Sequence, residues 1–328
     1  MTIRPSRLLT IPYYSKGFQK EINKINQTLV QNKIILINFV EKYHVMQTDC
    51  INCLLVQAQK MLTKHNIPKE RSNNIMDSFK LFIHKNRNNN LPSPEVACFL
   101  HRLIKKETHI EDLYKTEKEE YNQLMLDLEE DIREKIDKSA NPFQTALRYA
   151  LAGNIIDFGP PEPFNVLETL ATAASKIPVI DHSELLYEEL KRASSVLYLG
   201  DNTGEIVLDK IFISVINHPN LWFATRGAPV INDVTTEDAE NVGMAHVAKI
   251  ISNGYDAPST LEKHCSPSFK KLFDEVDIII SKGQGNLEGL INNRKKKIFF
   301  LFMVKCDVIG KLIGTHTKNS VVYFNQQS

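Results

Sequence analysis

Acidic and amide side chains follow a short apolar segment in the second half of the chain. Residues 195–205 read SVLYLGDNTGE, so Asp201, Asn202 and Glu205 come directly after the apolar run. A short apolar run that ends at a glycine is typical of a strand buried on both faces of a parallel sheet, and ligands bind beyond the carboxyl ends of such strands. Two carboxylates and an amide at that place favour a hard cation or a polar ligand.

A second apolar segment is followed by a basic and then an acidic side chain. Residues 221–224 (LWFA) run into TRGAPVIND, so Arg226 stands at the end of the run and Asn232 and Asp233 stand in the loop beyond it. The Asn-Asp pair repeats the oxygen donors of the first segment, and the arginine is suited to phosphate oxygens.

A third segment places a lysine among glycines. Residues 278–280 (III) are followed by SKGQGN, so Lys282 stands just before Gly283 and Gly285 at the start of a helical pattern. Backbone N–H groups freed by glycine, a helix N-terminus and a lysine together form a cradle for phosphate, although the spacing is not that of a Walker loop.

Each of these segments, taken alone, is also typical of a turn or a helix N-cap. Their combination is more informative, because acids follow two successive predicted strands and a lysine follows a third. Carboxylate and amide oxygens are suitable ligands for Mg²⁺ or Mn²⁺, while the lysine and the arginine suit phosphate oxygens. The combination predicts a divalent metal ion beside a phosphate group.

Two further motifs give weaker evidence about function. AGNIIDFG at 152–159 places Asn154 and Asp157 where they either cap a helix or reach the same cleft. Cys50 and Cys53 form a CxxC at the start of a predicted helix, where a redox pair or half of a zinc site is conceivable. Because no second CxxC and no paired histidine motif follows, we interpret both as cysteines buried on a helix face.

The elements that must position these side chains change character near residue 150. Glycine is absent from Lys20 to Leu151, and apolar residues recur there at helical spacing. Beyond that point short apolar runs alternate with helical segments, and strands are predicted at 196–199, 221–224, 247–251, 278–280, 298–302 and 321–324. We therefore predict an α/β protein with a helical N-terminal or cap region at 1–150. A three-layer α/β/α, Rossmann-like domain is predicted at 151–328, and its mostly parallel sheet carries the site at the C-terminal ends of its strands.

The predicted helices of the N-terminal region have distinct start signals. Ser93 and Pro94 are expected at the N-cap and first helical positions, and Asn141 with Pro142 opens another helix. The charged stretch 111–138 is expected to form one long, partly exposed helix. One long or broken helix is predicted at 22–40, and further helices are predicted at 50–62, 68–82 and 141–152.

Composition restricts the class of partner. The chain has 328 residues with 42% hydrophobic and 24% charged, and 40 basic against 39 acidic side chains leave a net charge of +1. This balance does not support binding to nucleic acid or to a membrane surface. The sequence shows no apolar run that would span a bilayer, no signal-peptide pattern and no disulfide framework among its five cysteines. We expect a cytoplasmic protein with a small-molecule partner, and the oligomeric state is left open.

With these residues in view, the sequence resembles the damage-control phosphatase family, formerly catalogued as a domain of unknown function and also labelled acidic-residue methyltransferase-like. The CxxC resembles the compact, mainly prokaryotic branch of that family. The matching stretches run in order from about residue 45 onward: CINCLL at 50–55, AGNIIDFG at 152–159, LGDNTGE at 199–205, ATRGAPVINDVT at 224–235, SKGQGN at 281–286 and MVKC at 303–306.

The resemblance implies a hydrolase: a metal-dependent phosphatase of small phosphate esters such as sugar phosphates or related damaged metabolites, active in metabolite repair. It implies a divalent metal, Mn²⁺, Co²⁺, Ni²⁺ or Mg²⁺, held by Asp201, Asn202 and Asp233. It also assigns phosphate binding to Lys282.

The remaining site residues have two origins. The resemblance places Asn154 and Asp157 at the substrate cleft, whereas Arg226 and Glu205 are our own additions from their positions at strand ends. The expected catalytic residues are Asp201, Asp157, Glu205 and Lys282, and the expected phosphate-binding residues are Asn154, Arg226, Lys282, Gly283 and Gly285.

The expected reaction is attack by metal-activated water on a phosphoryl group. Lys282 neutralises charge on the transferring group, and Asp157 or Glu205 serves as general base or acid. Attack by Asp201 itself is an alternative, but a metal-bound carboxylate is the poorer nucleophile.

Two other functions stay open at this point. A carboxyl methyltransferase using S-adenosylmethionine is compatible with a Gly-Asp turn after a Rossmann-like strand, but the chain lacks the glycine-rich GxGxG loop. A non-catalytic metal-binding module would bind metal without turning over any phosphate ester.

Overall fold

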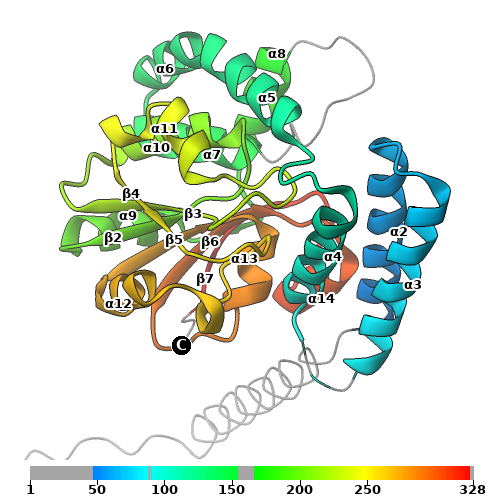
Figure 1. The fold of residues 1–328 in the computed structure, drawn as a ribbon. Helices are drawn as coiled ribbons and strands as arrows, with labels where there is room; N and C mark the ends of the chain where they lie inside the picture. Colours follow the sequence, from blue (N-terminus) through cyan, green and yellow to red (C-terminus); the bar gives the residue numbers. More distant parts are fainter. Residues whose placement is uncertain (1–46, 88, 90, 154–165, 326–328) are drawn as a thin grey trace, which may run out of the picture. The chain divides into compact units, whose positions relative to one another are not determined.

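The computed structural model describes residues 47–87, 89, 91–153 and 166–325 (Figure 1). The described residues all belong to one compact unit. The helix predicted at 22–40 and the motif residues Asn154 and Asp157 lie outside the described residues. In the described part of the chain, no helix combines the length and apolar character needed to cross a membrane.

A seven-stranded sheet forms the centre of this unit. Its order is β1-β7-β6-β5-β2-β3-β4, and all neighbouring strands are parallel except β6 and β7. The strands are β1 (Ile180–Asp181), β2 (Val196–Leu199), β3 (Leu221–Thr225), β4 (Lys249–Ser252), β5 (Ile278–Lys282), β6 (Lys297–Met303) and β7 (Ser320–Phe324).

The order in which strands are added to the sheet reverses at strand β2. From β2 the chain runs outward through β3 and β4 and then returns to the other side of β2 as β5. The carboxyl ends of β2 and β5 therefore form a topological switch point, where ligands bind in open α/β sheets.

Helices cover both faces of the sheet, and Figure 1 shows α5, α6, α7, α10 and α11 on one face and α12 and α13 on the other. The helices are α2 (Thr48–Lys64), α3 (Lys69–Lys85), α4 (Ser93–Thr108), α5 (Lys115–Asp127), α6 (Glu129–Asp137), α7 (Pro142–Ala152), α8 (Val166–Ala174), α9 (Ser183–Arg192), α10 (Glu205–Ile216), α11 (Thr236–Asn241), η2 (Met244–His246), η3 (Glu262–His264), α12 (Pro267–Glu275), α13 (Gly283–Leu290) and α14 (Asp307–Ile313).

Strand β2 shows why the sheet needs both layers. Its side chains alternate between faces, as the period of a strand requires. Val196 and Tyr198 pack into the core beneath α7 and α10, whereas Leu197 and Leu199 pack into the core beneath α12 and α13. Because every residue of β2 is buried, the strand reads as a continuous apolar run rather than an alternating one.

The first three described helices have a core of their own. Leu62 of α2, Phe79 of α3 and Leu100 of α4 belong to an apolar cluster separate from those on the sheet. Helix α4 also reaches the loop after β4, where Arg102 Nε donates to Asp256 Oδ2 at 2.8 Å and Glu95 pairs with Lys263 at 2.7 Å. This helix therefore connects the helical region to the sheet.

The structure confirms the α/β class and the six predicted strands, although the strand predicted at 247–251 begins two residues later, at Lys249. The two-residue strand β1 was not predicted, because two residues are too few to show a periodic pattern. The prediction of one helix over 111–138 is wrong, since α5 and α6 meet at Leu128. There the Leu128 N–H bonds to Met125 O, which tightens the last turn of α5, and the leucine side chain packs on the core of the sheet.

Two predicted helix starts can be compared with the structure. Asn141 caps α7, because its Oδ1 accepts from Gln144 N at 3.1 Å. Ser93 is already the first helical residue of α4 and Pro92 precedes it as the cap, so the predicted start is one residue late.

His101 of α4 is buried, and burial lowers its pKa from 6.5 to about 4. The unfolded chain then binds an extra proton between these values, so stability falls as the pH drops through this window. From pH 7.5 to pH 5 we expect wild type to lose about 2 kcal/mol more unfolding free energy than His101→Gln. Urea titrations at both pH values measure this difference; equal losses in the two proteins would contradict it.

Candidate metal and phosphate site

Backbone hydrogen bonds join the loops that follow β2 and β3. Val234 N donates to Asp201 O at 2.9 Å, and Thr203 N donates to Asn232 O at 2.9 Å. Asn202 and Asp233 form an isolated antiparallel bridge between the same loops. The side chains of the two predicted acid-bearing segments are thereby held together beyond the carboxyl ends of neighbouring strands.

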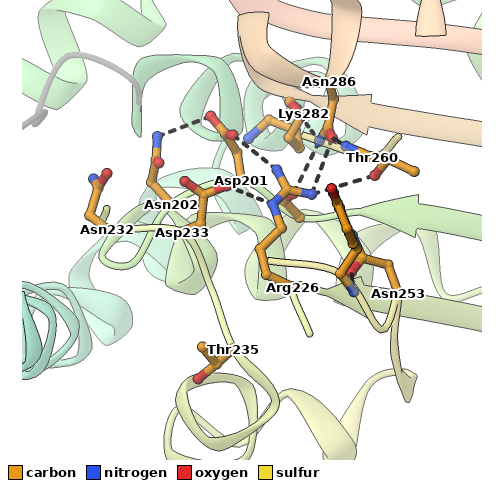
Figure 2. Close-up of polar contacts among 12 residues, drawn as sticks. Asp201, Asn202, Arg226, Asn232, Asp233, Thr235, Asn253, Thr260, Lys282 and Asn286 are labelled. Carbon is orange, nitrogen blue, oxygen red and sulfur yellow. Dashed lines mark hydrogen bonds and ion pairs between the residues drawn. The ribbon is translucent and has the colours of Figure 1, made fainter. Parts of the chain in front are cut away.

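The three predicted metal ligands form a compact, nearly buried cluster. Asp201, Asn202 and Asp233 are 7%, 8% and 3% exposed. Asn202 Nδ2 donates to Asp201 Oδ2 at 3.0 Å, and Figure 2 shows the three side chains gathered at one place. The cluster supplies the oxygen donors that a hard divalent cation prefers.

Gly283 brings the end of β5 against this cluster. It has a positive φ of 79°, and a Cβ added to it would lie 2.0 Å from Asp201 Oδ2. The missing side chain is therefore what lets the Asp201 carboxylate lie over the start of α13.

Arg226 lies between the two carboxylates of the cluster (Figure 2). Its Nε donates to Asp233 Oδ2 at 2.6 Å, and its Nη2 lies 3.6 Å from Asp201 Oδ1. Nη2 is buried and has no hydrogen-bond partner among the described residues, so it is a donor suited to an anionic oxygen. Burial raises the pKa of Asp233 to about 7 against the lowering effect of Arg226, and Asp201 raises it further.

The remaining N–H groups of Arg226 are positioned by two polar residues. Nη1 donates to Asn286 Oδ1 at 3.2 Å and to Thr260 Oγ1 at 3.4 Å. Asn286 in turn donates to Gly200 O at 3.1 Å and to Lys282 O at 2.8 Å. One buried amide thus links Arg226 to the ends of β2 and β5.

Lys282 is fully buried and its ammonium group is engaged by the protein itself. Nζ donates to Asp209 Oδ1 at 2.5 Å, to Ala150 O at 2.9 Å and to Glu205 Oε1. An ammonium group has three N–H donors, so all of them are used. The sequence suggested an open phosphate cradle at this lysine, whereas in the structure the amine lies inside a pair of carboxylates.

Glu205 lies between this lysine and the oxygen-donor cluster. Its Oε2 accepts from Asn202 Nδ2 at 3.4 Å, while its Oε1 pairs with Lys282. Burial raises the pKa of Glu205 to about 8, although Lys282 acts in the opposite direction.

The predicted phosphate-binding glycines differ in position. Gly283 contacts the site, as described above. Gly285 packs behind it, because a Cβ there would lie 2.3 Å from Pro258 O. Close backbone packing against the loop after β4 accounts for this glycine.

The residues present fit a divalent metal by their chemistry. They are two carboxylates and an amide, buried together beside an orphaned arginine N–H. Within the described part of the chain, no group of three or more His, Cys, Asp or Glu side chains is arranged as a metal site. The three predicted metal ligands are not such a group, because the third one, Asn202, binds through an amide oxygen.

Sequence reasoning missed Asp209 and did not assign a role to Asn286. Asp209 stands four residues after Glu205 in the helical stretch EIVLDKIF, and a second acid on the same face of a largely apolar helix is a signal that could have identified it. Asn286 was part of the SKGQGN motif, but nothing in its spacing indicated that it binds Arg226.

Comparison with known proteins identifies related chains. The family described as damage-control phosphatase ARMT1-like domain matches residues 46–321. A damage-control phosphatase of Pyrococcus horikoshii is 30% identical over 275 residues, which are 81% of this chain and 93% of the relative. A damage-control phosphatase of Archaeoglobus fulgidus is 29% identical over 232 residues, which are 69% of this chain and 80% of the relative.

A solved structure is also similar. The crystal structure of a DUF89 family protein from Pyrococcus horikoshii aligns with a TM-score of 0.78 at 27% sequence identity, covering 85% of this chain and 99% of that chain. The helical part and the mixed sheet described above therefore belong to a fold that is already known.

The contact between Gly283 and Asp201 can be tested with a matched pair of glycine variants. Gly283 and Gly314 both have a φ of 79°, but a Cβ at Gly314 would meet nothing within 4 Å. We expect Gly283→Ala to lose about 2 kcal/mol more unfolding free energy than Gly314→Ala, because only the first variant overpacks a buried carboxylate. Urea unfolding measures both, and equal losses would contradict the contact.

Proposed function

Because the chain belongs to the damage-control phosphatase ARMT1-like domain family, we propose that it is a phosphatase that hydrolyses small phosphorylated metabolites with a divalent metal ion. Its substrates would be phosphomonoesters, such as sugar phosphates or related damaged metabolites. The two relatives named as damage-control phosphatases support the reaction class.

The observation that carries this proposal is the convergence of Asp201, Asn202 and Asp233 beside Arg226. They come from loops after neighbouring strands and lie next to the switch point of the sheet. Oxygen donors for a cation and a buried guanidinium for an anion are the two groups that phosphoryl transfer requires.

Each side chain has a distinct role in the proposed reaction. Asp201, Asn202 and Asp233 hold the metal, which when bound supplies Lewis acidity and an activated water. Arg226 directs its Nη2 group to a phosphoryl oxygen, and Lys282 neutralises charge on the same group. Glu205 is our candidate general acid or base, since it lies between Asn202 and Lys282.

Other expectations also stay proposals. Asn154 and Asp157 are assigned to the substrate cleft from the sequence alone. We assign the chain to the CxxC-bearing branch, and Cys50 and Cys53 lie one turn apart near the start of α2. The interpretation of both as cysteines buried on a helix face is wrong, because Cys53 is exposed and Cys50 is half-buried. The division into a helical cap, 1–150, and a catalytic domain, 151–328, and a cytoplasmic location are proposed on the same footing.

The proposal is tested by assaying chelator-treated protein on a panel of phosphate esters with Mn²⁺, Co²⁺, Ni²⁺ or Mg²⁺ added back. We expect metal-restored phosphate release, and a loss of at least about 100-fold in Asp201→Ala, since the variant removes a metal ligand. The exposed carboxylate of Asp77 provides the control, and Asp77→Ala should retain wild-type turnover.

Two outcomes would replace the proposal. Metal binding without release of phosphate from any ester would indicate a binding module. Methyl transfer from S-adenosylmethionine that survives chelation would indicate a methyltransferase.

A further inference from the structure

Lys282 is held in a closed network that the proposed reaction has to open. Its three N–H groups donate to Glu205, Asp209 and Ala150 O, so none remains for a phosphate. If this lysine binds a phosphoryl group, one of its three partners must release it. The direction of the ammonium group then depends on which partners keep their hydrogen bonds to it.

We propose that Asp209 is the positioning residue of Lys282: it retains the ammonium group while Glu205 exchanges it for a phosphoryl oxygen of the substrate. This inference rests on the proposed phosphatase function and deepens it by adding a residue to the phosphate-binding device. Tyr198 donates a hydrogen bond to Asp209 and so holds its carboxylate in place.

The location of Glu205 makes it the partner that leaves. It is the first residue of α10 and its second oxygen lies 3.4 Å from Asn202 Nδ2, so it already faces the oxygen-donor cluster. The same Asn202 Nδ2 donates to Asp201 Oδ2 at 3.0 Å, so Glu205 and Asp201 share this amide as a partner. A ligand in that cluster therefore meets Glu205 before it meets Asp209.

Asp209 is fixed by more rigid elements. It lies one turn further along α10, on the same face as Glu205 because four residues separate the two. Tyr198 OH donates to Asp209 Oδ1 at 2.7 Å, and Tyr198 belongs to the central strand β2. Both residues are fully buried, so the carboxylate cannot turn toward solvent.

Asp209 also has the capacity to bind the lysine more fully. Its Oδ2 is buried and has no hydrogen-bond partner among the described residues, so this carboxylate can hold the ammonium group through either oxygen while the N–H that Glu205 releases goes to the phosphoryl oxygen. A buried amine without a charged partner favours its neutral form, whereas the adjacent Asp209 carboxylate keeps Lys282 charged. The phosphate would therefore meet an ammonium ion in a defined position.

The chain contains a matched control for this arrangement. Lys118 is also a buried lysine between two carboxylates, with Asp112 Oδ2 at 3.0 Å and Asp238 Oδ2 at 2.8 Å. Asp112→Asn thus removes one carboxylate from a comparable buried pair that has no place in the proposed site.

The experiment compares wild type, Asp209→Asn, Tyr198→Phe and Asp112→Asn. Turnover is measured on the best ester of the panel, and affinities for inorganic phosphate and for Mn²⁺ are measured by calorimetry. For Asp209→Asn we expect kcat/KM to fall about 30-fold or more and phosphate affinity about tenfold, with Mn²⁺ affinity within about twofold of wild type. Tyr198→Phe should lose about three- to tenfold in kcat/KM, because the carboxylate loses one support.

Separating phosphate affinity from Mn²⁺ affinity distinguishes positioning from a general structural role. Unchanged phosphate affinity and kcat/KM in Asp209→Asn would overturn the inference. The inference would also be overturned if Asp209→Asn lost affinity for both inorganic phosphate and Mn²⁺ and Asp112→Asn lost both affinities to the same extent. If Asp209→Asn does not fold, Tyr198→Phe decides, and wild-type behaviour in that variant refutes the inference.

The two proposals can fail independently. A wild-type protein that binds inorganic phosphate but hydrolyses no ester would refute the phosphatase function, and the comparison of phosphate affinities would still test Asp209.

Discussion

Two buried cations, each between two carboxylates, are the interaction on which the site depends. Arg226 lies between Asp201 and Asp233, and Lys282 lies between Glu205 and Asp209. Removing such groups from water is costly unless they are paired and hydrogen-bonded, and leaving one charge without its partner is strongly destabilising. The two clusters therefore fix the ends of β2, β3 and β5 relative to one another.

The charge balance of these clusters agrees with the proposed chemistry. The four carboxylates outnumber the two cations, and Lys305 also acts on Asp233, so the site keeps an excess of negative charge that suits a cation when all groups are ionised. Burial is the main cause of the raised pKa of Glu205 and Asp233, and nearby acids raise both further. The proposed metal would relieve that repulsion, and Arg226 and Lys282 would then be available to phosphate oxygens.

Polar groups of the main chain and of amide side chains keep this arrangement rigid. The loops after β2 and β3 are joined by backbone hydrogen bonds, and Asn286 ties Arg226 to the carbonyl oxygens of Gly200 and Lys282. Asn122 of α5 accepts from Gly204 N at 2.7 Å, which fixes the turn before α10. A preorganised site of this kind does not have to rearrange its dipoles when charge develops on a substrate.

The sequence by itself determined the class of the fold, six strands and the kinds of side chain at their ends. Short apolar runs and the polar residues after them are local features, and burial on both faces of a sheet imposes them on the sequence directly. The break of the 111–138 helix at Leu128 and the two-residue strand β1 were not visible, because packing on the core rather than local pattern produces them. Only the tertiary structure decided how the charges pair: Lys282 meets Asp209 across 73 residues because β5 returns beside β2, and strand order is not written in any local spacing.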